Sequence, residues 1–284
     1  MATDHEDSAV LLPVFITEFL VILIINAVTI IAFARIRQLR KRSTYLIMNL
    51  TVIDLLVGAV TVPMYVYQED KESKGFTWPG SLIWAMEITF PIASQVNLSL
   101  ISLERLHATL FPFRHCLITK RSYIKVIVGS WLIIFALASA IASLSEDAFS
   151  YAWASFSVVT LVILAVCCII IFVNVQRSPH SQHHGSVHTE TKLSVTLLLV
   201  TGISVLTILP WAVFSSMPVD IQEELSNASR VEISDMLAII YFANSIVNPL
   251  VYAIRMHEFR KAIGNLVCNG TQARVNPLQP HTVS

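Results

Sequence analysis

The stretch SLERLHATLFPFRH, Ser102 to His115, puts the adjacent charges Glu104 and Arg105 directly behind more than twenty almost entirely apolar residues. Over its 284 residues the chain is 55% hydrophobic and 13% charged, whereas soluble domains carry roughly 25% charged residues. A hydrocarbon core about 30 Å thick needs roughly 20 apolar residues per helical span. The stretch is therefore predicted to mark the end of a membrane-spanning helix.

Seven apolar windows long enough to cross a bilayer follow one another along the chain. They cover residues 10–34, 44–67, 80–104, 123–145, 152–176, 193–217 and 233–254. The predicted fold class is an all-α membrane protein, a bundle of seven transmembrane helices over residues 10–254. An N-terminal segment, 1–9, precedes the bundle, and an amphipathic eighth helix over 255–268 and a tail over 269–284 follow it.

The distribution of basic residues predicts how the bundle is oriented. Of the 19 Lys and Arg residues, only Lys71, Lys74 and Arg230 fall in the even-numbered connections. Under the positive-inside rule the N-terminus is then extracellular. We expect a multi-pass protein of the plasma membrane whose basic cytoplasmic face contacts anionic lipid. Because 19 acidic residues balance the bases, nothing in the charge indicates a nucleic-acid partner.

Two sites of covalent modification fit this orientation. Asn227 begins an Asn-Ala-Ser sequon in the last outer connection, where it is accessible to glycosylation. Cys268 ends the amphipathic stretch and is a candidate for a palmitoyl anchor. An unmodified thiol is the alternative for Cys268.

Polar side chains inside the spans are few, and each is a candidate for function because a charge at the bilayer centre costs on the order of 3 kcal/mol. Asp54 lies ten residues into the second span. Its expected neighbours are Asn26 in the first span, Ser94 in the third, and Asn244, Ser245 and Asn248 in the seventh. The oxygens of such a group suit water or a small cation. A purely structural hydrogen-bond cluster is the alternative.

The third span has one polar face. Glu87, Ser94 and Arg105 share it, because steps of seven and eleven residues return to nearly the same angle on a helix. Eighteen residues separate Glu87 from Arg105, which is roughly 27 Å at 1.5 Å per residue. One helix is thus predicted to connect a polar outer mouth with a polar cytoplasmic end.

From about Asn26 to Cys268 the chain resembles the rhodopsin-like (class A) family of G protein-coupled receptors. The matching motifs, in order, are LIMNLTVIDLLVG around Asp54, ERL at 104–106, Trp131, Pro210 and NPLVY at 248–252. The resemblance implies a receptor that passes an extracellular ligand signal to a heterotrimeric G protein by outward movement of the sixth helix. Arrestin is a further candidate partner.

The same resemblance implies an activation switch at the cytoplasmic end. Arg105 corresponds to a latch that pairs with Glu104 and with Glu190 near the inner end of the sixth helix. Pro210 would supply the hinge of that helix. Arg105 and Tyr252 would form the floor of the cavity that admits the G protein.

The resemblance also assigns chemistry to the polar core. Asp54 and Ser94 correspond to residues of the family's sodium site, so an allosteric sodium ion is the one cofactor considered. No enzyme activity is expected, because the histidines lie in loops and ends and not in metal-ligand clusters within the spans. An opsin would carry a lysine where this chain has Phe242.

Several positions depart from the family pattern. Leu106 and Ile208 replace residues typical of the family, and Gly80 takes the place of its usual disulfide cysteine. The missing disulfide, a fifth span without proline, a very short N-terminus and a short tail after Cys268 are most similar to the melanocortin, adenosine and cannabinoid cluster, in which the melanocortin branch fits best. However, Met64, Gly80 and Trp84 stand where that branch has calcium-binding acids. The alternative to a coupling receptor is a receptor-like orphan or decoy that does not engage G protein.

The outer mouth is the expected ligand site. Glu87 lies where amine receptors of the family keep an acid for a ligand ammonium, and cation–π contact favours an aromatic cup around such a ligand. The predicted cup consists of Trp84, Phe90, Trp211, Phe214 and Tyr241. Alternatively, these rings fill the core and Glu87 reaches water. The ligand class stays open among small amine, nucleoside, lipid and peptide.

Overall fold

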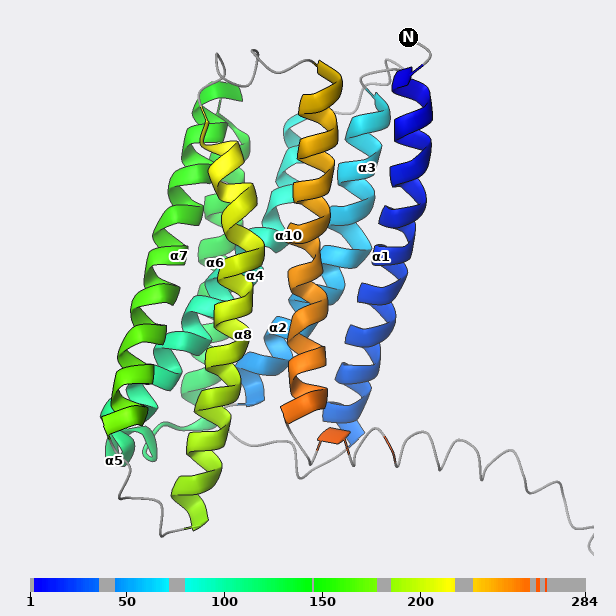
Figure 1. Ribbon diagram of the computed structural model, residues 1–284. Coiled ribbons are helices and arrows are strands. Elements are labelled where there is room, and N and C mark those ends of the chain that lie inside the picture. The colour runs from blue at the N-terminus through cyan, green and yellow to red at the C-terminus, as the bar shows by residue number, and fades with distance from the viewer. Residues whose placement is uncertain are drawn as a thin grey trace, which may run out of the picture.

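The computed structural model describes residues 3–35, 44–71, 80–144, 146–177, 185–217, 227–255, 259–260 and 264, with only the backbone described near several helix ends. Within these ranges the chain is helical and contains no strand. The helices run side by side in one bundle (Figure 1). They are α1 (Thr3–Arg35), α2 (Thr44–Leu56), η2 (Val57–Thr61), α3 (Val62–Lys71), α4 (Gly80–Leu110), α5 (Pro112–His115), α6 (Lys120–Ala142), α7 (Glu146–Arg177), α8 (Gly185–Ser215) and α10 (Asn227–Arg255).

The apolar windows explain this architecture. Each predicted window overlaps one long helix or, for the second window, the continuous run α2–η2–α3, so the seven-helix membrane bundle is confirmed. By length and composition, five described segments can cross a membrane: Leu12–Arg35, Thr44–Tyr67, Lys120–Ala142, Ala148–Asn174 and Ile233–Ile254. A bilayer offers no water to backbone groups, and a helix satisfies those groups internally.

Helix α4 lies inside the bundle, where it packs against α2, α6, α7 and α8. Its polar side chains are buried: Thr89, Ser94, Gln95, Asn97, Ser99, Ser102 and Arg105. The outer helices show the opposite pattern, since Leu132 and Ile133 of α6 and Ile169 of α7 are more than 60% exposed on the lipid-facing side. The polarity of the third span therefore follows from its interior position.

The second span contains a helical irregularity that the sequence analysis did not predict. One π-helical turn, η2, separates α2 from α3. Pro63 follows this turn, and in a regular α-helix a proline ring clashes with the carbonyl four residues earlier. Opening the helix into a π turn removes that clash, and such turns are frequent at functional sites. Here the turn begins three residues after Asp54.

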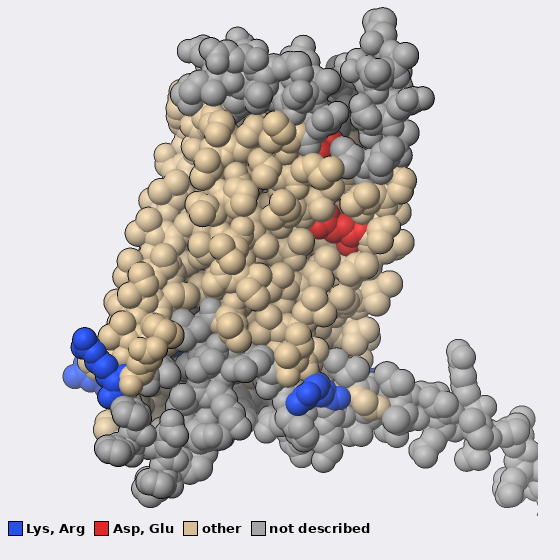
Figure 2. All heavy atoms as spheres, in the orientation of Figure 1, with Lys and Arg blue, Asp and Glu red and all other residues tan. Residues whose placement is uncertain are grey.

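The two ends of the bundle differ in charge. On the face in Figure 2, the Lys and Arg atoms lie at the lower edge, and acidic atoms lie among uncharged residues in the upper half. The lower edge is where α1 and α10 end (Figure 1). This basic end corresponds to the predicted cytoplasmic side, while the orientation in the membrane stays a prediction.

Several predicted features lie outside the described residues. They include most of the eighth helix over 255–268, Cys268 and the tail, and the side chain of Asn227, which is the first residue of α10. Phe259 is described: its side chain is buried, and its ring centroid is 5.6 Å from that of Phe33 in α1. The segment after α10 therefore contacts the inner end of α1.

Candidate functional site

The carboxylate of Asp54 joins three helices in the middle of the bundle. Asp54, on α2, is completely buried. Ser94 Oγ of α4 and Ser245 Oγ of α10 each donate a hydrogen bond to its Oδ1 at 3.2 Å. Asn248 Nδ2 of α10 donates to Oδ2 at 2.7 Å. The structure thus brings together four of the polar residues predicted from spacing, and we call these four the polar core.

The two other residues predicted for this region contact its neighbours. Asn26 Nδ2 of α1 donates to the backbone carbonyl of Ser245 at 3.0 Å. Asn244 Oδ1 accepts a hydrogen bond from Thr207 Oγ1 of α8 at 3.4 Å. Asn26 therefore connects α1 to α10, and Asn244 connects α10 to α8 instead of facing Asp54.

The donor set of the polar core fits a small hard cation. Such ions take oxygen ligands, and the core offers the carboxylate oxygens of Asp54 and the hydroxyls of Ser94 and Ser245. Asn248 Oδ1 is buried and has no hydrogen-bond partner in the described part of the chain. Among the same residues, no three His, Cys, Asp or Glu side chains gather in the way that a transition metal requires. A sodium ion is the metal that these residues suit.

A second buried polar group, which the sequence analysis missed, lies next to the polar core. Gln95 Nε2 donates to Tyr241 Oη at 3.0 Å, and Thr160 Oγ1 donates to Gln95 Oε1 at 2.7 Å. All three side chains are more than nine-tenths buried. This group, the Gln95 bridge, joins α4, α7 and α10. The sequence could have indicated this group, because Gln95 is a polar amide next to Ser94 in an otherwise apolar span.

A third polar junction lies between α2, α4 and α6. Trp131 Nε1 donates to Asn49 Oδ1 at 3.1 Å, and Asn49 Nδ2 donates to Asn97 Oδ1 at 2.8 Å. Asn97 Nδ2 in turn donates to the backbone carbonyl of Leu46 at 3.0 Å. The junction explains why a tryptophan occupies this place in α6, since its ring nitrogen completes the chain of donors.

At the inner end of α4, Glu104 holds Arg105 in an ion pair. Arg105 Nε lies 2.5 Å from Glu104 Oε2, and Nη2 donates to Oε1 at 3.0 Å. Tyr123 Oη of α6 donates to the same Oε1 at 2.7 Å, and His115 Nε2 of α5 lies 3.3 Å from it. The Arg105 side chain is only 2% exposed. The pair is therefore fixed to both α5 and α6.

The other residues predicted for the switch occupy α8 and α10. Tyr252 is fully buried, and its hydroxyl has no hydrogen-bond partner among the described residues. Pro210 lies inside α8, one turn from the outer end of that helix. Glu190 is in the inner part of α8, but its side chain is not described. The pairing of Arg105 with Glu190 stays a prediction.

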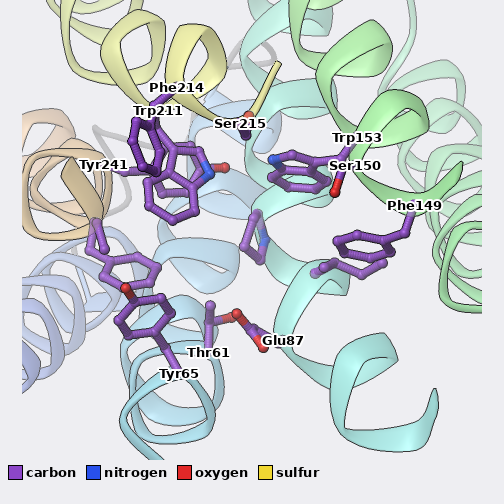
Figure 3. Close-up of a pocket in the computed structure, with 14 residues that line it drawn as sticks. Thr61, Tyr65, Glu87, Phe149, Ser150, Trp153, Trp211, Phe214, Ser215 and Tyr241 are labelled. Atoms are coloured by element: carbon purple, nitrogen blue, oxygen red, sulfur yellow. The ribbon is translucent and has the colours of Figure 1, made fainter. Parts of the chain in front are cut away.

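A cavity of about 240 Å³ lies at the outer mouth (Figure 3). Glu87 is the acidic residue among its described lining, and the predicted aromatic residues Trp211, Phe214 and Tyr241 line it too. The side chain of Trp84 is not described. The lining also includes residues that were not predicted: Thr61, Tyr65, Phe149, Ser150, Trp153 and Phe242.

Phe90 is not among the described residues that line this cavity, so its place in the aromatic cup stays a prediction. Its ring centroid is 6.5 Å from that of Trp131 in α6. Glu87 and Pro91, four residues apart, both line the cavity. At 100° per residue, Phe90 lies about 60° from Glu87 on the side of the helix away from Pro91. Its ring packs there against Trp131 of α6.

Comparison with known proteins agrees with this arrangement. Residues 25–152 match the model of the family described as 7 transmembrane receptor (rhodopsin family). The chain is 22% identical to Melanocortin receptor 5 of Ovis aries, over 93% of this chain and 86% of that protein. It is 27% identical to the D(1B) dopamine receptor of Xenopus laevis, over 98% and 72%, and 26% identical to the Histamine H2 receptor of Cavia porcellus, over 90% and 80%. Over residues 25–152 the chain is similar to the rhodopsin-like family of G protein-coupled receptors.

This receptor is a multi-pass membrane protein and not an enzyme. Its relatives include melanocortin and amine receptors at similar identity, so the comparison does not favour one branch. One of its departures from the family pattern, Ile208, lies in the core of α8. Ser204 is completely buried and Ile208 is 1% exposed, with the Ser204 hydroxyl lacking a hydrogen-bond partner among the described residues. Small and aliphatic side chains thus fill this part of the core of α8.

Proposed function

We propose that this receptor passes an extracellular ligand signal to a heterotrimeric G protein at the plasma membrane. The observation that carries the proposal is the buried Glu104–Arg105 pair at one end of α4, while Glu87 lines the cavity at the other end. The two ends are roughly 27 Å apart along one helix. A ligand that binds better to a conformer with a broken pair shifts the population toward that conformer.

In this proposal the ion pair keeps the inner end closed. Activation moves the inner part of α8 outward about Pro210 and exposes Arg105 and Tyr252 to the G protein alpha subunit. Glu190 adds a second contact to Arg105 in the closed state, and arrestin uses the same inner surface. Couplings between distant sites are typically about 1–3 kcal/mol, and one ion pair at a partly wet boundary supplies an energy of that order.

The membrane arrangement follows the charge asymmetry. The basic edge in Figure 2 supports a cytoplasmic placement of that end, against anionic lipid. The N-terminus and Asn227 are then extracellular, which makes Asn227 a glycosylation site. Cys268 then lies beside the inner leaflet, where palmitoylation would anchor the segment after α10.

We further propose that the ligand is a small cationic amine. The cavity places one carboxylate, that of Glu87, among aromatic rings, and no Lys, Arg or His is among its described lining residues. A desolvated ammonium over such rings gains about 2 kcal/mol from cation–π contact. The printed names of two relatives, a dopamine receptor and a histamine receptor, agree with this chemistry.

The polar core would bind sodium as an allosteric ion. Asp54, Ser94 and Ser245 would supply the ligands named above. An ion at this position links α2, α4 and α10, so it would favour whichever conformer keeps those helices in their present relation.

Replacement of Glu104 by Gln tests the coupling. The variant loses the charge that holds Arg105, and we expect basal signalling in at least one G-protein pathway to rise by about fivefold or more. Tyr123→Phe removes one hydrogen bond to Glu104 and should give a smaller rise. Ser143→Ala, exposed at the other end of α6, is the control and should change nothing. If no variant raises signalling in any pathway at equal surface expression, the receptor does not couple and the decoy alternative is favoured.

A further inference from the structure

A second carboxylate lies behind the described lining of the ligand cavity, bonded to one of the lining residues. Asp235 of α10 is only 7% exposed, although its helix reaches the outer end of the bundle close by. Tyr65 Oη donates a hydrogen bond to Asp235 Oδ1 at 3.0 Å, and the Tyr65 side chain lines the cavity. The sequence analysis did not include Asp235 in any site, and the proposed function does not use it.

Helix geometry places Asp235 on the cavity side of α10. Ala238 and Phe242 both line the cavity. Positions i, i+3 and i+7 share one face of a helix, so Asp235 stands one turn above Ala238 on the same face. Glu87 therefore lines the cavity from α4, whereas Asp235 is not itself a lining residue and stands one turn above Ala238, bonded to the lining residue Tyr65.

A buried hydroxyl gives independent evidence that this cavity takes a polar ligand. Thr61 Oγ1 belongs to the π turn, and the residue is 1% exposed. The hydroxyl has no hydrogen-bond partner among the described residues, and Thr61 lines the cavity. Figure 3 shows Thr61 between Tyr65 and Glu87. A buried hydroxyl without a partner costs roughly 1–3 kcal/mol, which a ligand N–H group at this position would remove.

From these contacts we infer that the cavity selects an elongated dication, a molecule with two ammonium groups joined by an apolar chain. One ammonium binds Glu87 within reach of the Thr61 hydroxyl. The other binds Asp235, whose Oδ2 forms no hydrogen bond or ion pair in the described part of the chain. The aromatic rings contact the connecting chain. This inference rests on the proposed amine ligand and adds the second charge, because one ammonium would leave a second buried carboxylate at the cavity uncompensated.

The test uses the full chain, purified and reconstituted in lipid nanodiscs, with α,ω-diamines of three to ten carbons as probes. The n-alkylamines of the same lengths are the matched monocations. Binding is measured as the rise in unfolding temperature with ligand concentration. We expect an optimum diamine length, and at that length about tenfold or tighter binding than the matched monoamine, as expected for one added charge-assisted contact.

Variants assign the two charges. Asp235→Asn keeps an acceptor for Tyr65 but removes the charge, so it should abolish the preference for diamines and leave monoamine binding unchanged. Glu87→Gln should weaken the binding of both classes. Glu18→Gln neutralises a carboxylate of α1 that is equally buried, at 7% exposure, but whose Oε2, unlike Asp235, has no hydrogen-bond partner in the described part of the chain, so it should retain the preference.

Three results overturn the inference. They are equal binding of diamines and monoamines by the unmodified receptor, an unchanged preference in Asp235→Asn, and a loss of both ligand classes in Asp235→Asn, which would indicate a structural role. Glu87-dependent monoamine binding without diamine preference would leave the amine ligand standing. If no amine binds, the amine ligand fails as well, while the Glu104 variants still decide G-protein coupling separately.

Discussion

Replacement of Gly58 by Ala should destabilise the receptor, because α1 and the π turn approach each other closely at this residue. A Cβ atom at position 58 would lie 2.7 Å from Ile22 Cγ2 and 3.2 Å from Ile22 Cβ, whereas ordinary contacts are 3.4–4 Å. Ile22 is β-branched and has one strongly preferred rotamer in a helix. The overlap can be relieved only by moving α1 away from η2.

The expected magnitude follows from two opposing effects. Overpacking of a filled core costs about 1–3 kcal/mol, and exchanging a helical Gly for Ala gains up to about 1 kcal/mol. The net expectation is a loss of about 1–2 kcal/mol in the free energy of unfolding. Asn26 Nδ2 also donates to the Ile22 carbonyl at 3.0 Å, so a shift of α1 disturbs the bond from Asn26 to Ser245 beside the polar core.

Two matched variants isolate the steric effect. In the described part of the chain no atom lies within 4 Å of a Cβ built on Gly129 of α6 or Gly202 of α8. Gly129→Ala and Gly202→Ala should therefore be neutral or stabilising by up to about 1 kcal/mol. The assay is thermal unfolding of the purified receptors in one detergent. If Gly58→Ala unfolds at the same temperature as these two variants or above them, the close approach of α1 and η2 is not a tight contact.

Three further substitutions test other contacts in the same assay. Trp131→Phe leaves Asn49 Oδ1 without its ring donor and should cost about 1–3 kcal/mol, and a fully stable variant would show that the junction of α2, α4 and α6 is replaceable. Gln95→Leu breaks both bonds of the Gln95 bridge and should cost a similar amount, whereas wild-type stability would argue that the bridge contributes little. Phe33→Ala removes the ring packed on Phe259 and should cost about 3–5 kcal/mol if the site stays as buried as it is here, so a loss below 1 kcal/mol would contradict that packing.

The sequence predicted the features that appear as long hydrophobic runs or as charged residues whose burial in a membrane span is energetically costly. The seven windows follow from hydrophobicity alone, and Asp54 could be singled out because a carboxylate in a span needs partners. Spacing then brought Ser94, Ser245 and Asn248 to the same depth, where the structure shows them in contact. The ion pair of Glu104 with Arg105 was visible as two adjacent charges at the end of an apolar run.

The features that the sequence analysis missed leave no clear pattern of hydrophobic or charged residues in the sequence. Helix α7 is apolar on all sides, so periodicity could not show that Phe149 and Trp153 face the cavity. Phe90 was predicted to line the cavity because it is near Glu87 in sequence, whereas its ring packs against Trp131 of α6. Asp235 was missed because a carboxylate near the end of a span has no evident cost, and only its bond to Tyr65 reveals its place.

The proposed coupling between the cavity and the inner end has few physical routes in this fold. Tyr241 lines the cavity with its ring and bonds Gln95 through its hydroxyl. The next residue on α4, Ser94, bonds Asp54. A ligand that moves Tyr241 therefore acts on α4 at the same level as the polar core, and α4 carries Arg105 at its inner end. Because packed interfaces are bistable and do not deform continuously, a small displacement at Gln95 can select between two arrangements of α4. Gln95→Leu should then change the response to an agonist more than it changes binding, since the mutated side chain lies behind the cavity wall and not in it.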